Sequence, residues 1–259
     1  MLINYIIASI IAVVLGQITN HLIRRLPEII EDEDAIKKFI PTIKSDFKLD
    51  IKYSLILLIL FNLVMYFVGS SYITWIYMPL IAMLVIALVI DFKMQLIPDT
   101  VQVVVLILGL IVTAIDYTNW LNHIIGMVLG AAIFILIAIF SKLVFRKEGM
   151  GFGDIKLMGG LGLIFGIDKL PANFVDFFSQ AQVILTITVL AFFLAAIVAI
   201  ILIITKKTEK SEYMAFGPYI VIATIVVILF GTTPFINAYF AMCSGLADYV
   251  TEIILKFMK

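Results

Sequence analysis

The sequence predicts an all-α fold, a polytopic integral membrane protein with about eight transmembrane helices. Hydrophobic residues make up 63% of the 259 positions and charged residues only 14%, a composition typical of chains embedded in a bilayer. Apolar runs long enough to cross a membrane as helices recur along the chain. The remaining lysines and arginines gather in alternate loops, which is the distribution expected of a membrane protein with a fixed orientation.

The first apolar run covers about residues 2–22, and we assign residues 1–27 to the first transmembrane helix. Neither a basic n-region nor a small-residue cleavage site accompanies it, so we expect a retained span and not a removed signal peptide. Residues 28–52 are polar and charged, which predicts a short cytoplasmic loop. The acidic run within this loop is interpreted as a solvated face or turn.

The transmembrane core is expected over residues 53–231, and its runs are separated by short polar turns. The segment 232–259 is apolar but carries Asp248 and Glu252, so it either lies in the membrane interface or spans the bilayer. The apolar runs of the core lie at about 53–69, 72–90, 100–117, 120–145, 155–167, 181–205 and 214–231.

Charge predicts the orientation of these spans. With eight spans and an outside N-terminus, the inside loops hold 15 lysines and arginines, whereas the outside loops before residue 235 hold only Lys169. Such a bias marks the cytoplasmic side, so we expect a multi-pass protein of a prokaryotic inner or plasma membrane. Asp91 and Asp154 then both lie at the cytoplasmic membrane face, while Asp116 and Asp168 lie on the opposite face.

One stretch concentrates glycine and charge beside the membrane. Gly149, Gly151 and Gly153 alternate directly before Asp154, and glycines permit close backbone approach and unusual backbone angles. A carboxylate near hydrocarbon costs roughly 2.5–3.5 kcal/mol, so it is kept for a function or satisfied by a partner. The structural alternative is that Asp154 caps a helix that begins at Ile155.

Three other charged residues require the same comparison. Asp91 ends the apolar run 84–90, and its structural alternative is an ordinary helix-end residue that reaches the interface. Asp99 follows Pro98 and has the stronger structural explanation, because the first turn of a helix favours an anion. Lys156 is either a loop cation that sets topology or a cation near the aspartates, where it would favour their ionised form.

Two facing aspartates in a partly desolvated site share a proton. The ionised carboxylate can then take a proton from water as the water attacks a peptide carbonyl, while the protonated one polarises that carbonyl. This chemistry needs no metal or nucleophilic side chain. A single cysteine and two histidines argue against a zinc site, and a net charge of zero gives no indication of a nucleic-acid partner.

The motifs together resemble the type IV prepilin peptidase family, the Gly-x-Gly-Asp aspartic proteases of membranes. Residues 149–157 closely match that family's second aspartate motif, and residues 90–99 resemble its first. Residues 216–219 are similar to a further motif near the C-terminus, and residues 16–27 resemble the end of the family's first span. The resemblance therefore extends, in order, over nearly the whole chain.

The resemblance implies a catalytic pair and a substrate class. Asp91 and Asp154, which are 63 positions apart, would be the catalytic aspartates. The substrates would be type IV prepilins or pseudopilins, held in the lipid bilayer and cut at its cytoplasmic boundary, with no cofactor required for cleavage. The positions assigned to the motifs or to their support are Gly149, Gly151, Gly153, Lys156 and Asp99.

The chain also departs from the family pattern. Many bacterial members carry two Cys-x-x-Cys pairs in a long cytoplasmic insert and methylate the new N-terminus with S-adenosylmethionine. Here the loop 28–52 is short and lacks cysteine, and Leu57 stands where the family's Arg-Tyr-Pro-x-x-Glu stretch has its glutamate. We therefore expect cleavage without efficient methylation.

Three other functions share some of these features. A transporter or channel also uses broken helices with an intramembrane aspartate, although near the midplane and not at one face. A non-catalytic assembly scaffold would keep the spans without needing both aspartates. A presenilin-like protease shares the glycine–aspartate chemistry but cuts deep within a span, and a soluble pepsin fold is excluded by composition.

Overall fold

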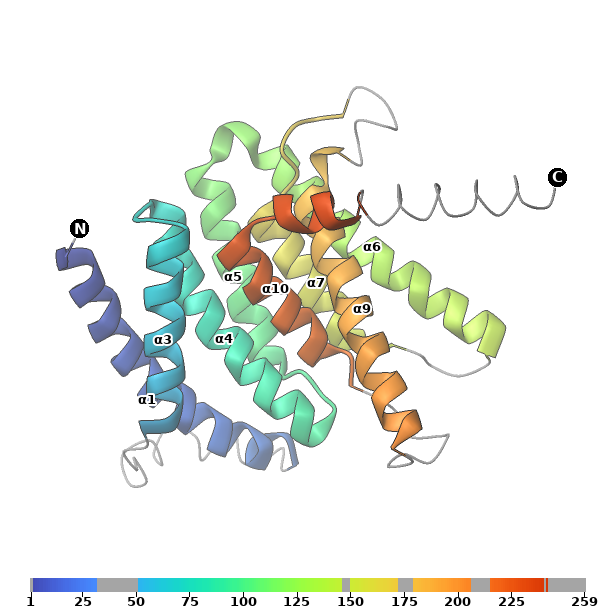
Figure 1. The fold of residues 1–259 in the computed structure, drawn as a ribbon, viewed down its shortest axis with the longest axis horizontal. Helices are drawn as coiled ribbons and strands as arrows, with labels where there is room; N and C mark the ends of the chain where they lie inside the picture. Colours follow the sequence, from blue (N-terminus) through green and yellow to red (C-terminus); the bar gives the residue numbers. More distant parts are fainter. Residues whose placement is uncertain are drawn as a thin grey trace, which may run out of the picture.

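The computed structural model describes residues 2–31, 51–145, 150–171, 179–205, 215–239 and 241. All secondary structure in these ranges is helical (Figure 1), which confirms the predicted all-α class. The elements are α1 (Leu2–Glu31), α3 (Ile51–Phe67), α4 (Tyr72–Met94), α5 (Asp99–Ile115), the 3₁₀ turn η1 (Tyr117–Asn119), α6 (Trp120–Phe145), α7 (Phe152–Phe165), α9 (Gln182–Ile204) and α10 (Gly217–Phe230).

Several of these helices can cross a bilayer. Among the described residues, four are long and apolar enough, within Leu2–Pro27, Tyr72–Met94, Tyr117–Val144 and Gln182–Ile204. A fifth span results if α10 and the helix Thr233–Tyr239 count as one, although they meet at 107°. The bend follows α10, whose C-cap is Gly231 at φ +71°, a left-handed conformation that suits glycine. A multi-pass membrane protein is therefore supported, and the number eight stays a prediction.

The first helix is longer than predicted. We expected the first span to end near residue 22 and a loop to begin at residue 28, but α1 continues to Glu31. Ile23 and Leu26 are only 3% and 4% exposed, so the helix keeps an apolar face against the core beyond residue 22. The rest of the predicted loop, residues 32–50, and most of the segment 232–259 lie outside the described residues.

Helix α4 forms the centre of the bundle. Its strongest apolar window is 61% buried, against 17–22% for the other three long spans. It contacts α1, α3, α5 and α10, and Figure 1 shows it crossing between α3 and α5. A helix that is apolar on all sides packs on all sides, so the end of α4 is held firmly by the core.

Helices α6 and α7 pack with their backbones in contact. A Cβ added to Gly126 of α6 would collide with the carbonyl oxygen of Gly162 of α7, and the reverse substitution would collide with the carbonyl oxygen of Gly126. A Cβ at Gly130 would meet the carbonyl oxygen of Met158 in the same way. Small residues thus permit close helix packing.

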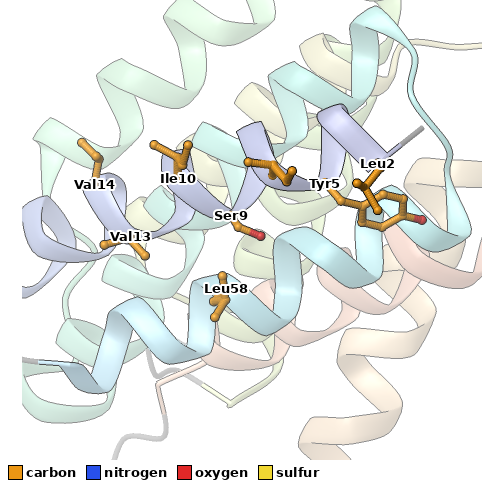
Figure 2. A pocket seen from close by; sticks show the side chains of 8 residues that line it. Leu2, Tyr5, Ser9, Ile10, Val13, Val14 and Leu58 are labelled. Carbon is orange, nitrogen blue, oxygen red and sulfur yellow. The ribbon is translucent and has the colours of Figure 1, made fainter.

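An apolar groove of about 510 Å³ lies along the outer face of α1, beside Leu58 of α3 (Figure 2). Leu2, Ile10 and Val14 line this groove and are more than half exposed. Tyr5 and Ser9 provide its polar atoms, and within the described part of the chain no carboxylate, amine or imidazole lines it. The surface suits hydrocarbon and offers no acid–base pair, so the chemistry of this protein has to be sought elsewhere.

Candidate active site

Asp91 lies in the last turn of α4 and is only 4% exposed. The helix ends at Met94, and the N–H of its C-cap, Gln95, donates to the main-chain oxygen of Asp91 at 2.9 Å. Oδ2 of the Asp91 side chain is buried and has no hydrogen-bond partner among the described residues. Asp91 is therefore not a helix-end residue reaching toward the interface, because the packing of α4 carries its carboxylate into the protein.

Asp154 lies in the first turn of α7 and is 6% exposed. The alternative that it caps a helix beginning at Ile155 is wrong, because α7 begins at Phe152 with Gly151 as its N-cap. The N–H of Asp154 donates to the carbonyl oxygen of Gly151 at 3.2 Å. The helix therefore starts before the aspartate, whose side chain is buried in the bundle and accepts a hydrogen bond from the backbone N–H of Gly151.

The two aspartates meet at Gly217, the first residue of α10. A Cβ added there would collide with Oδ2 of Asp91 and would lie 3.2 Å from Oδ1 of Asp154. Both carboxylates thus reach the same point beside the glycine backbone. The structure thus brings together the two aspartates that the sequence singles out. A third helix, α10, approaches both of them closely because its first residue is a glycine.

A cavity of about 260 Å³ opens onto this meeting point. It contains six of the seven predicted site residues; the seventh, Gly149, lies outside the described part of the chain. The cavity is lined by Asp91, Gln95, Leu96, Ile97, Asp99, Gln102, Gly151, Phe152, Gly153, Asp154, Lys156, Ala215 and Phe216.

Gly153 is closely packed against α5 and the turn before it. A Cβ at this position would lie 3.3 Å from Nε2 of Gln102 and 3.3 Å from Cβ of Ile97. Such contacts are tight enough that the neighbours would have to move. The expectation that a side chain here would disturb the backbone path or the packing agrees with this geometry.

Lys156 and Asp99 form an ion pair at the edge of the cavity. Nζ of Lys156 lies 2.8 Å from Oδ1 of Asp99, and the two side chains are 43% and 79% exposed. Asp99 occupies the first turn of α5, as predicted. Lys156 belongs to α7 and not to a loop, so the pair joins two helices that border the cavity. An exposed pair of this kind contributes about 0–1 kcal/mol.

Sequence reasoning did not select two residues of this site, Gln102 and Gly217. Gln102 is only 8% exposed and interrupts the apolar run 100–117, which is a signal that the sequence did contain. Gly217 lies in the stretch 216–219 that resembles a family motif, but nothing local shows that it faces the aspartates.

Asp116 and Asp168 do not line this cavity. Asp116 is the C-cap of α5 and Asp99 lies at its start, so a helix of 17 residues, about 25 Å long, separates them. Asp168 follows α7, which begins at the cavity. Both acids therefore lie at the end of the bundle opposite the candidate site.

The arrangement supports acid–base chemistry. Two carboxyl groups that are buried and close together cannot both carry a charge easily, so they share a proton. One of them can then act as a base while the other acts as an acid on the same bound molecule.

Comparisons with known proteins find a family that is similar to this chain. The type IV leader peptidase family matches residues 78–204, which include both aspartates. A prepilin leader peptidase/N-methyltransferase of Neisseria gonorrhoeae is 29% identical over 180 residues, 68% of this chain and 57% of that protein. The protein of the same name from Pseudomonas putida is 31% identical over 166 residues, 63% of this chain and 52% of the relative.

A third protein of that name, from Stutzerimonas stutzeri, is 33% identical over 143 residues, 55% of this chain and 45% of the relative. The chain thus spans about half the length of the curated relatives that it matches. No solved structure matches it significantly.

Proposed function

This chain belongs to the type IV leader peptidase family, and we propose that it is a membrane aspartic endopeptidase. Its substrates are type IV prepilins or pseudopilins, from which it removes the short basic leader. The observation that carries the proposal is the convergence of Asp91 and Asp154, both buried, on the backbone of Gly217 beside a cavity.

The pair hydrolyses the peptide bond by general acid–base catalysis. One carboxylate removes a proton from a water molecule as its oxygen attacks the scissile carbonyl, while the other, protonated, donates to the carbonyl oxygen. When the tetrahedral intermediate collapses, a carboxyl group protonates the leaving amine and the C–N bond breaks. Burial of the site from bulk water strengthens each of these interactions.

The site faces the cytoplasm in this proposal, and the chain crosses the membrane about eight times. Arg24 and Arg25 lie near the end of α1, Lys52 at the start of α3 and Lys93 near the end of α4. Figure 1 places these three helix ends on the same side of the bundle. Cations on one side agree with the positive-inside rule, and the compartment is the inner or plasma membrane of a prokaryote.

Methylation of the new N-terminus is inefficient or absent in this proposal. The relatives are named as N-methyltransferases, so S-adenosylmethionine is the donor to test. However, Leu57 stands where the resemblance expects a glutamate, and it is fully buried in α3. A methyl donor needs a few placed polar groups to orient it, and a buried leucine cannot provide one.

The proposed function is tested by incubating the purified protein with a candidate prepilin and labelled S-adenosylmethionine, and measuring the masses of both products. We expect a free leader and a mature pilin without an added methyl group. An uncut prepilin would contradict the peptidase. Quantitative addition of one methyl group, absent without the enzyme, would overturn the methylation claim and leave the peptidase standing.

A further inference from the structure

We propose that the side-chain carbonyl oxygen of Gln102 binds the substrate by accepting a hydrogen bond from a main-chain N–H near the scissile bond. The inference rests on the proposed peptidase function and deepens it, because it identifies a residue that sets which peptide bond reaches the aspartates. Gln102 acts here as a substrate-binding residue and takes no part in proton transfer.

The orientation of the Gln102 amide is determined by one hydrogen bond. Nε2 donates to the main-chain oxygen of Ile97 at 3.1 Å, within the buried part of the protein. A carbonyl oxygen can only accept, so the nitrogen of the amide has to face Ile97 and the oxygen has to face the other way. Gly153 allows this placement, since a Cβ there would lie 3.3 Å from Nε2.

The oxygen that remains is an acceptor without a donor. Oε1 of Gln102 is buried and has no hydrogen-bond partner among the described residues, and the side chain lines the same cavity as Asp91 and Asp154. A buried acceptor without a partner destabilises a fold, and native structures keep few of them. Its place beside the two aspartates points to a donor on the bound substrate.

The chemistry of a polypeptide identifies that donor. An amide oxygen accepts only, and the main chain of a peptide offers one kind of donor, its N–H groups. In an extended segment successive residues point to opposite sides, so an N–H near the scissile carbonyl can face Gln102 while that carbonyl faces the aspartates. This contact fixes the register of the peptide and therefore the position of the cut.

The test uses the full chain in proteoliposomes and synthetic prepilin peptides in which single backbone N–H groups are replaced by ester oxygens. In the wild-type protein we expect one ester, at a peptide bond near the scissile one but not at it, to lower kcat/KM about ten-fold, the order expected for one hydrogen bond. Gln102→Met should lower kcat/KM for the unmodified peptide by a similar factor, mainly through KM, and the same ester should then have no further effect.

Two further variants separate binding from packing. Val105→Ala is the matched control, because Val105 is fully buried three residues later in α5, packs against Gly160 and does not line the cavity. It should respond to the ester as the wild-type protein does. Gln102→Asn keeps the amide group but shortens the side chain by one methylene group. This variant replaces Gln102→Met in the test if Gln102→Met does not fold.

The outcomes are distinguishable. Suppose that the wild-type protein cuts the unmodified peptide, but that every ester lowers kcat/KM equally in the wild-type protein and in the Gln102 variants. The role of Gln102 is then overturned, and the peptidase function stands. The same conclusion follows if Val105→Ala abolishes the ester effect equally. If the wild-type protein leaves every prepilin peptide uncut, the proposed function fails, and the Gln102 inference fails with it.

Discussion

Buried polar side chains lie near both ends of the helices α5 and α7, but the two groups differ in how their hydrogen bonds are satisfied. At the end that holds Asp116, His123 is 7% exposed, and its Nδ1 lies 2.9 Å from the carbonyl oxygen of Leu163. Its Nε2 lies 3.5 Å from Oδ2 of Asp116. At the other end, Oδ2 of Asp91 and Oε1 of Gln102 are buried without a hydrogen-bond partner in the described residues.

This difference distinguishes a structural polar cluster from a reactive one. A satisfied buried network stabilises and orients the elements around it. An unsatisfied one costs stability, and a protein retains it where a ligand or a reaction uses the free groups. We therefore expect substitutions at the Asp91 end to change catalysis more than stability, and substitutions at the His123 end to do the reverse.

The largest effect is expected from the aspartates. Asp91→Asn and Asp154→Asn should each lower prepilin cleavage by at least about 10³-fold, because each removes a proton acceptor or donor from the reaction. The measurement is cleavage by the reconstituted protein, with circular dichroism to show that it folds. Asp168→Asn, at the opposite end, is the control and should cleave normally. Substantial activity in either site variant would refute the catalytic pair.

A smaller loss of cleavage is expected when a methyl group is added at Gly217, where the two carboxylates meet. Gly217→Ala should reduce cleavage about 10²-fold, because its Cβ would displace the carboxylate of Asp91, and small misplacements of reacting groups are costly. Gly159→Ala is the matched control, since its Cβ would make only an ordinary contact, 3.5 Å from Cβ of Ala131. Equal rates for the two variants would show that the approach of the aspartates to Gly217 has no functional value.

At the opposite end the effect should fall on stability. His123→Phe removes the contacts to Leu163 and Asp116 and should destabilise the protein by about 1–3 kcal/mol, because the carbonyl of Leu163 loses a buried donor. Denaturant unfolding in detergent measures this loss, and cleavage per folded molecule should remain as in the wild-type protein. Normal stability with lost cleavage would mean that the two ends are not functionally distinct.

The smallest effect is expected at the edge of the cavity. Lys156→Met breaks the exposed pair with Asp99 and should change kcat/KM by no more than about two-fold, since such pairs contribute little. The pH–rate profile of Lys156→Met should match that of the wild-type protein. Asp99→Asn should have the same small effect on kcat/KM, because it breaks the same ion pair. A displaced profile in Lys156→Met alone would instead show that its charge acts on the aspartates.

The sequence by itself determined the all-α class, the order of the apolar helices and the choice of Asp91 and Asp154. These are local properties: the length of an apolar run, the glycines before a carboxylate and a charge at the end of a hydrophobic segment can all be recognised without knowing what packs against them. The early start of α7 at Phe152 was missed, although helix boundaries are also local, because the glycines obscured the cap.

Only the tertiary structure decided what surrounds the aspartates. Gly217 faces them because α10 packs against both α4 and α7, and no feature within residues 216–219 specifies that neighbour. Likewise, the ion pair between Asp99 and Lys156 depends on how α5 meets α7. Contacts between helices depend on the shapes of both surfaces, so one stretch of sequence cannot specify them.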